Sequence, residues 1–259
     1  MKLNTFYAGL AALFMLSTMS CAHVNKPQDG EPRNSEPATE QFRSIYGCEV
    51  EYERLGPVRN SDIPTVILAH GFRRSRDSMR GWAQYWAELG VPSIILDFCN
   101  ATLINGHHQR NAVDMRALAE KLGLDKVVYA GFSAGGLAAY LAALDDPAAA
   151  AYLGLDSVDS GDLAREAPRQ LTVPALFLVG EPSMCNGHGN FNPVFERWPK
   201  YTVMSVPQAT HCQFETPYDK RCAWLCGHRS QEEKSALEFE LRTLATQWLL
   251  QAAYPGIAP

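Results

Sequence analysis

Short apolar runs alternate with longer stretches of helical periodicity along most of this chain. The runs are apolar at nearly every position, a pattern typical of strands buried on both faces, as in a parallel sheet. They occupy residues 65–69, 93–96, 126–130, 152–155, 174–179 and 201–206. Between them, apolar positions recur at helical spacing over residues 77–89, 111–122, 134–144 and 231–252. The pattern predicts an α/β fold with a mostly parallel, doubly wound sheet, and residues 44–54 are expected to add an antiparallel edge hairpin.

The first 20 residues are expected to be a signal peptide. Lys2 is their only charge, and the apolar stretch 6–16 is too short to span a bilayer. Residues 16–21 resemble a bacterial lipoprotein box, in which Cys21 receives the lipid. Cleavage after Ala22, as in an ordinary exported protein, is the alternative.

Residues 21–40 are polar, acidic and proline-containing, so they are expected to form a disordered tether. The folded domain is then predicted over residues 41–259. A tether after an acylated cysteine separates a domain from a membrane surface. The expected location is the bacterial cell envelope, as a membrane-anchored lipoprotein, with a secreted or periplasmic protein as the alternative.

Composition narrows the partners of this domain. The chain is 46% hydrophobic, which excludes a disordered protein, and its formal charge of −5 without a dense basic block argues against nucleic acid. Six cysteines follow Cys21, and an even number in an exported chain indicates disulfides. A bridge from Cys185 or Cys212 would brace the loops near the candidate base. The cluster at 222–228 lacks zinc-site spacing, so no metal or cofactor is expected, and we expect a monomer.

Residues 131–135 read Gly-Phe-Ser-Ala-Gly between an apolar run and a predicted helix. This is G-x-S-x-G in the strand–turn–helix context that gives the motif its meaning. The turn exposes the Ser133 hydroxyl, and the following helix directs N–H groups and positive partial charge toward it. Ser133 is therefore the candidate nucleophile, and the N–H of Ala134 is a candidate oxyanion donor.

A serine hydroxyl needs a base, and His211 is the candidate because it follows the last apolar run. The base needs a carboxylate that orients it. Asp156 directly follows the run 152–155 and is favoured. Glu181, after the next run, is the alternative acid, and Asp159 is a weaker third choice.

The second oxyanion donor is expected where the first strong apolar run ends in Ala-His-Gly-Phe at residues 69–72. Gly71 lets the backbone turn, so that the N–H of Phe72 can face the Ser133 oxygen. His70 is expected to be structural. Four arginines follow and form either a solvated rim or a surface that attracts anionic substrates: Arg73, Arg74, Arg76 and Arg80.

Residues 70–72, 131–135, 154–156 and His211 occur in the order found in the α/β-hydrolase superfamily, which the chain resembles over about residues 60–250. The position of Asp156 resembles that of the triad acid in pancreatic-type lipases and chlorophyllases. Phe72 is similar to the aromatic oxyanion residue of cutinases and bacterial polyesterases. The resemblance implies a triad of Ser133, His211 and Asp156.

Only residues 157–172 separate Asp156 from Val173, just before the next run, which leaves no room for a lid or cap domain. An open site suits short acyl esters, or bulky and polymeric esters. The predicted function is hydrolysis of carboxylic esters by a serine through an acyl-enzyme. A lipase, polyesterase or thioesterase is the alternative within this fold, and a non-catalytic, lipid-anchored envelope binding protein is the alternative of another class.

Overall fold

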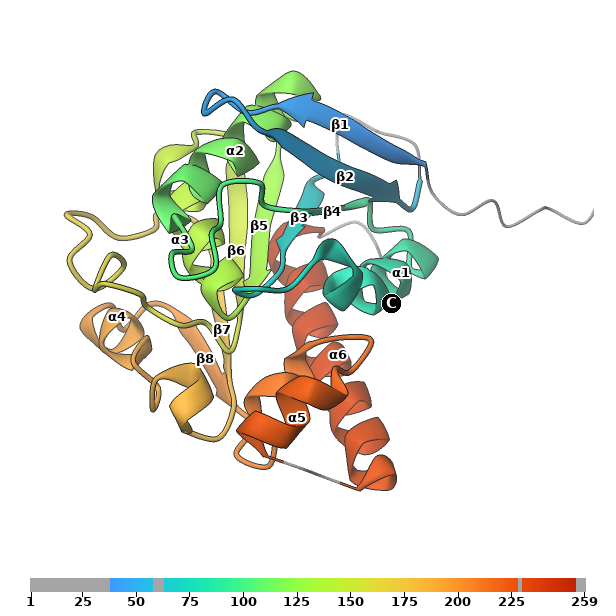
Figure 1. Ribbon diagram of the computed structural model, residues 1–259, viewed down its shortest axis with the longest axis vertical. Helices are drawn as coiled ribbons and strands as arrows, with labels where there is room; N and C mark the ends of the chain where they lie inside the picture. Colours follow the sequence, from blue (N-terminus) through green and yellow to red (C-terminus); the bar gives the residue numbers. More distant parts are fainter. Residues whose placement is uncertain (1–37, 58–62, 228–229, 255–259) are drawn as a thin grey trace, which may run out of the picture. The chain divides into compact units, whose positions relative to one another are not determined.

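Eight strands form one sheet in the computed structural model, which describes residues 38–57, 63–227 and 230–254 (Figure 1). Their order is β1-β2-β4-β3-β5-β6-β7-β8. The pairs β1–β2 and β2–β4 are antiparallel and the remaining pairs are parallel, which confirms the predicted α/β class. An antiparallel edge hairpin is present, but its first strand lies before the predicted residues 44–54. The strands are β1 (Thr39–Arg43), β2 (Glu49–Leu55), β3 (Thr65–Ala69), β4 (Ser93–Leu96), β5 (Val127–Phe132), β6 (Ala149–Leu155), β7 (Ala175–Val179) and β8 (Thr202–Ser205).

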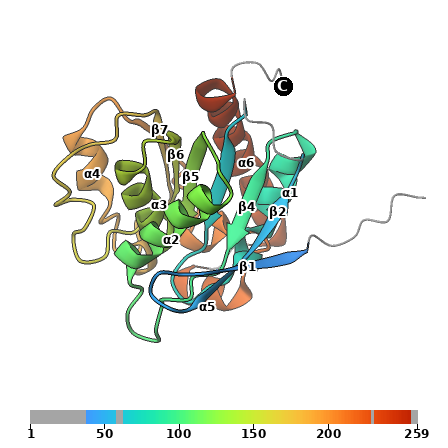
Figure 2. The ribbon, with the colours of Figure 1, turned by 90° about the horizontal axis from the view of Figure 1, so that it is seen from above.

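Helices cover both faces of this sheet, as in a doubly wound fold. The described α-helices are α1 (Arg80–Glu88), α2 (His108–Lys121), α3 (Ala134–Asp145), α4 (Asn192–Arg197), α5 (Lys220–Cys226) and α6 (Gln231–Ala253). Helices α2 and α3 pack on one face, and α1 and α6 pack on the other (Figures 1 and 2). Short 3₁₀ turns are η1 (Arg76–Met79), η2 (Met184–Asn186) and η3 (His211–Phe214).

Two buried tryptophans on α1 tie distant parts of the chain together. The indole N–H of Trp86 donates to Thr246 Oγ1 on α6 at 3.0 Å, and that of Trp82 donates to the carbonyl of Phe214 in η3 at 2.9 Å. Both rings also bury apolar surface, which supplies most of the stabilisation of such a contact. Helix α1 therefore fixes the turn that carries His211.

Two elements begin three residues before the sequence prediction, and two short helices were not predicted. Strand β6 begins at Ala149 instead of residue 152, because a run of alanines, which has low strand propensity, pairs with β5 in the sheet centre. Helix α2 begins at His108 instead of residue 111. Helices α4 and α5 were not predicted, since they are too short for a clear period.

The predicted signal peptide, Cys21 and the tether up to residue 37 lie outside the described residues. The end of the predicted tether is wrong by two residues, because Thr39 and Glu40 belong to β1. The Glu40 carboxylate accepts a hydrogen bond from the Tyr52 hydroxyl at 3.0 Å and one from Arg54 Nε at 2.6 Å. These cross-strand contacts hold polar residues in an edge strand. Among the described helices, none is long and apolar enough to cross a membrane.

The edge hairpin is fastened to the rest of the domain by a disulfide and a buried acid. Cys48, between β1 and β2, is bridged to Cys99, which follows β4. Asp114 on α2 is fully buried. Its carboxylate accepts one hydrogen bond from Ser44 Oγ at 2.6 Å and another from the Asn100 side-chain amide. Burial raises the pKa of Asp114, against the lowering effect of these two donors.

Candidate active site

A sharp turn between β5 and α3 carries Ser133. Its φ of 54° and ψ of −124° lie in a region that non-glycine residues rarely adopt. A Cβ at Gly131 would overlap the backbone of Gly135, and one at Gly135 would overlap the backbone carbonyl of His70. Both glycines are therefore required for the elbow to pack against β3, as the motif predicts.

The structure brings Ser133, His211 and Asp156 into one hydrogen-bonded chain. Ser133 Oγ lies 2.9 Å from His211 Nε2, and His211 Nδ1 lies 2.6 Å from Asp156 Oδ2. All three side chains are buried. Because a carboxylate can only accept, His211 Nδ1–H donates to Asp156, which leaves Nε2 free to accept the serine proton.

Asp156 is held from its other side by the loop after β7. The Gly180 N–H donates to Oδ1 at 2.9 Å, and the Asn186 amide donates to Oδ2 at 3.1 Å. Hydrogen bonds to both carboxylate oxygens fix the plane of the carboxylate. Sequence reasoning missed Asn186, whose only signal was its place in the loop where this fold commonly has an aspartate.

The carboxylates of the two alternative acids, Glu181 and Asp159, do not contact His211. Glu181 is exposed on the loop after β7, where its own carbonyl accepts a hydrogen bond from Asn186. Asp159 is buried and accepts hydrogen bonds from the N–H groups of Ala164 at 3.0 Å and Arg165 at 2.9 Å. Asp159 thus closes the turn after β6, and the carboxylate that contacts His211 is that of Asp156.

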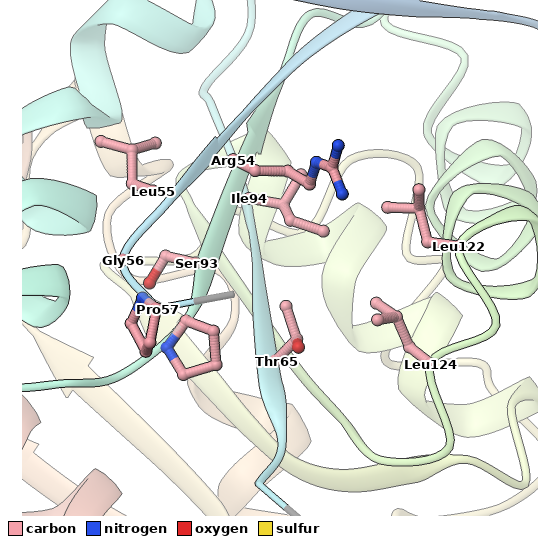
Figure 3. Close-up of a pocket in the computed structure, with 10 residues that line it drawn as sticks. Arg54, Leu55, Gly56, Pro57, Thr65, Ser93, Ile94, Leu122 and Leu124 are labelled. Atoms are coloured by element: carbon pink, nitrogen blue, oxygen red, sulfur yellow. The ribbon is translucent and has the colours of Figure 1, made fainter. Parts of the chain in front are cut away.

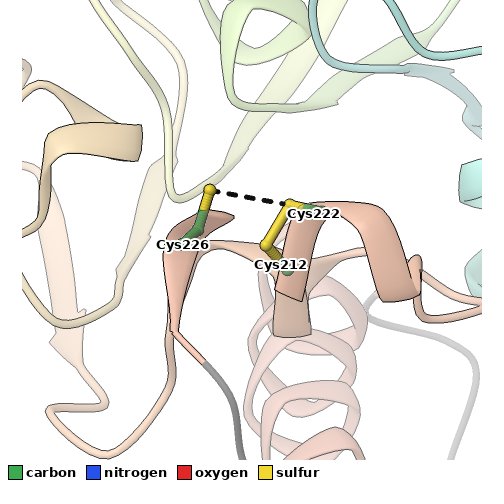
Figure 4. Close-up of side chains that lie close together, drawn as sticks. All are labelled: Cys212, Cys222 and Cys226. Atoms are coloured by element: carbon green, nitrogen blue, oxygen red, sulfur yellow. Dashed lines mark hydrogen bonds between the residues drawn. A yellow bond between two sulfur atoms is a disulfide. The ribbon is translucent and has the colours of Figure 1, made fainter. Parts of the chain in front are cut away.

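Two disulfides meet at α5 beside the histidine. Cys222 is bridged to Cys212, the neighbour of His211 (Figure 4). Cys226 is bridged to Cys185 in η2. Three of these sulfur atoms lie within 4.8 Å of one another, a spacing that also suits a metal, but each is already in a disulfide. The prediction that bridges from Cys185 and Cys212 brace these loops is confirmed.

A small cavity brings together the two expected oxyanion donors. Phe72, after β3, and Ala134, the first residue of α3, both line it. The first N–H groups of a helix have no acceptor within the helix, so that of Ala134 is available to a ligand. His70 lies beneath this loop: its Nδ1 contacts the Gly71 carbonyl at 2.7 Å, and its Nε2 accepts from the Phe98 N–H at 3.2 Å. Burial lowers the pKa of His70, in keeping with a neutral, structural ring.

Three of the four arginines after this loop are engaged in ion pairs. Arg76 and Arg80 both bind the buried carboxylate of Glu53, which holds the pKa of Glu53 at about 2. Arg74 Nε lies 2.6 Å from Glu215 Oε1, just beyond η3. Arg74, Arg76 and Arg80 therefore serve as ion-pair partners within the domain, and neither as a solvated rim nor as a surface for anionic substrates. Arg73 is exposed.

Glu215 is the most unusual acid near the site. Its side chain has no exposed surface, and its second oxygen has no hydrogen-bond partner among the described residues. Burial raises the pKa of Glu215 to about 7, against the lowering effect of Arg74. The Arg74–Glu215 pair joins the loop after β3, which carries Phe72, to the end of η3, which carries His211.

A second hollow lies far from this chemistry. It has a volume of about 320 Å³ and is lined by Leu55, Thr65 and Ser93 among others (Figure 3). Thr65 and Ser93 begin β3 and β4, whereas the candidate triad follows the carboxyl ends of the strands. In open α/β sheets ligands bind at the carboxyl ends, so this hollow is not the candidate site.

The fold is that of the α/β hydrolases. No known family profile and no curated protein sequence matches the chain. A ferulic acid esterase from Streptomyces cinnamoneus is similar over 82% of this chain and 85% of its own, with a TM-score of 0.64 and 14% identity.

Two further solved structures agree. A Xanthomonas campestris protein described as an α/β serine hydrolase without a lid is similar over 87% of this chain and 98% of its own (TM-score 0.60, 16% identity). A thermophilic esterase from Thermogutta terrifontis is similar over 80% of this chain and 99% of its own (TM-score 0.53, 18% identity). This chain likewise has only loops and turns between β6 and β7, so it lacks a lid.

Proposed function

We propose that the protein is a serine esterase that hydrolyses carboxylic esters. The observation that carries the proposal is the chain of contacts from Ser133 Oγ to His211 Nε2 at 2.9 Å and from His211 Nδ1 to Asp156 at 2.6 Å. These residues stand on a strained elbow at the carboxyl edge of the sheet. The fold is similar to that of two esterases of known structure and of a serine hydrolase described as lacking a lid.

In the proposed reaction, Ser133 Oγ attacks the ester carbonyl carbon while His211 Nε2 takes the hydroxyl proton. The carbonyl oxygen becomes an oxyanion that accepts hydrogen bonds from the N–H groups of Phe72 and Ala134. Asp156 stabilises the imidazolium and holds it in place. The intermediate collapses as His211 returns the proton to the departing alcohol oxygen.

The acyl-enzyme that remains is hydrolysed by the same groups. His211 takes a proton from water, the hydroxide attacks the acyl carbon, and the second tetrahedral intermediate releases the acid and Ser133. Every step uses side chains and backbone N–H groups of this chain, and each proton passes through His211.

Within the superfamily, we place the enzyme near the chlorophyllase-like and cutinase-like esterases. The support is the acid directly after β6 and the aromatic Phe72 after β3. We further propose that it is exported and held at a bacterial membrane by a lipid on Cys21, on the support of the signal-like start and the lipoprotein-box sequence.

The test is fluorophosphonate labelling with an assay of 4-nitrophenyl acetate hydrolysis. Ser133→Ala should lose both labelling and turnover, because it removes only the nucleophile. Ser160→Ala, an exposed serine on the loop after β6, is the matched control and should keep both. Turnover by a folded Ser133→Ala variant would overturn the assignment of Ser133 as the nucleophile. Wild-type protein that neither labels nor hydrolyses any ester would support a non-catalytic envelope protein instead.

A further inference from the structure

Helix α5 presents large apolar side chains to solvent. Trp224 is 83% exposed and Leu225 is 63% exposed, and Trp224 is the most exposed of the five tryptophans of the chain. Met184 in η2, which is 76% exposed, lies nearby, because the next residue, Cys185, is bridged to Cys226 with 5.7 Å between their Cα atoms. Large apolar side chains that gather on a surface commonly mark a binding site.

The outer face of α5 also carries two positive charges. Lys220 lies four residues before Trp224, and Arg221 lies four residues before Leu225, so the members of each pair are neighbours on one side of the helix. Both basic side chains are exposed. The acid that precedes them, Asp219, caps the helix by accepting a hydrogen bond from the N–H of Arg221 at 2.8 Å.

Two disulfides hold this face outward. Cys222 and Ala223 on the inner side of α5 are buried. A helix of seven residues is only marginally stable by itself, and here the bridges from Cys222 and Cys226 fix it to two other loops. The outer face is therefore in place before any partner arrives, which keeps the ordering cost of binding small.

We infer that the outer face of α5 docks onto a lipid bilayer that contains anionic headgroups. The docking surface consists of Met184, Lys220, Arg221, Trp224 and Leu225. Aromatic and aliphatic side chains beside basic ones suit a membrane interface, where the apolar groups enter the acyl boundary and the cations meet phosphate. A second copy of the chain fits this surface less well, because a symmetric contact would bring the same cations against one another.

The chain before the domain is long enough for this contact. If a lipid on Cys21 anchors the protein, as proposed above, residues 22–37 join the anchor to the described domain and, fully extended, could span at most roughly 55 Å. Such an anchor would raise the effective concentration of the bilayer at α5, so even weak docking would be populated. Because Cys222 is bridged to Cys212, docking would also keep the turn of His211 close to the membrane surface.

The experiment measures vesicle binding by the full chain with Cys21→Ser, released from cells, so that no lipid on the chain contributes. This protein, with α5 unchanged, should co-sediment with vesicles of equal parts phosphatidylcholine and phosphatidylglycerol. Its tryptophan emission should shift to the blue, because Trp224 leaves water. Trp224→Ala combined with Leu225→Ala should remove the shift and lower the partition constant by roughly 100-fold, about tenfold for each apolar side chain.

A second pair of substitutions tests the charges. Lys220→Gln combined with Arg221→Gln should lower binding to these vesicles by roughly 25-fold, about fivefold for each charge near an anionic surface. Binding to pure phosphatidylcholine should not change. Ile45→Ala is the matched control and should change neither, because Ile45 is 73% exposed on the turn between β1 and β2, at the opposite end of the domain from α5 in Figure 1.

Three results would overturn the inference. The first is a protein with an unchanged α5 that binds neither kind of vesicle, and the second is unchanged binding by the folded Trp224→Ala, Leu225→Ala protein. The third is a dimer, seen by light scattering, that the same two substitutions dissociate, which would assign this face to a second copy of the chain. None of these results bears on Ser133, so the proposed esterase function is tested separately.

Discussion

Replacing Glu215 by glutamine should stabilise the protein at pH 8, although it removes a charge from an ion pair. The Glu215 side chain has no exposed surface, and among the described residues only Arg74 binds it, through one of its two oxygens. Burying an ion pair costs desolvation that the attraction between its charges often fails to offset. Glutamine has nearly the shape of the protonated acid and carries no charge to desolvate.

The size of the effect follows from the pKa of Glu215, which burial raises from the ordinary value of 4.5 to about 7. A folded-state pKa above the unfolded value means that the folded protein binds the proton more tightly. The stability contribution is therefore complete below pH 4.5 and is lost as the pH rises to about 7. At about 1.4 kcal/mol per pH unit, the wild-type protein loses about 3 kcal/mol over this window, and the glutamine variant does not.

Urea unfolding at pH 4.5 and at pH 8 measures this difference. The two proteins should be about equally stable at pH 4.5, and the variant should be more stable by about 3 kcal/mol at pH 8. Glu88→Gln, an exposed acid on α1, is the control and should follow the wild-type protein at both pH values. If Glu215→Gln and the wild type show the same pH dependence, the explanation of the raised pKa by burial is refuted.

Three further outcomes are expected. Asp156→Asn should lower kcat by about 10³- to 10⁴-fold, because the imidazole loses its orienting acceptor, whereas Glu181→Gln should lower kcat by no more than about tenfold. Ester hydrolysis assays, with thermal melts to check folding, measure both variants. The reverse ranking would move the acid to the loop after β7. Replacing Cys48 by serine should cost about 4 kcal/mol, because its bridge spans a sequence separation of 51 residues, and an unchanged melting temperature would contradict this. Cys21→Ser should release the protein from membranes in cell fractionation, and a mature N-terminus at His23 would show ordinary secretion instead.

The sheet and the elbow could be predicted from sequence because both leave strong local patterns. Strands buried on both faces are continuously apolar, so the central strands stand out along the chain. The elbow motif occupies only residues 131–135, so it can be recognised locally, although the backbone that Gly135 must avoid is that of the distant His70. Because both Asp156 and Glu181 closely follow a strand, Asp156 is favoured by its resemblance in position to the acid of lipases and chlorophyllases.

What could not be predicted depends on contacts between distant residues. Arg74 and Glu215 are 141 positions apart, and nothing near either of them indicates the other. Asn186 binds Asp156 only because the loop after β7 folds back on the end of β6. Likewise, six cysteines allow many pairings, and only the folded chain shows that Cys222 and Cys226 bridge to different loops.

Those two bridges give α5 a mechanical role in the site. Through Cys222 the helix is covalently joined to the turn of His211, and through Cys226 it is joined to the loop whose Asn186 grips the carboxylate partner of that histidine. The base and its acid therefore share one crosslinked support, and thermal motion carries them together. We therefore expect heat inactivation to coincide with global unfolding, which activity and melting curves recorded side by side would show.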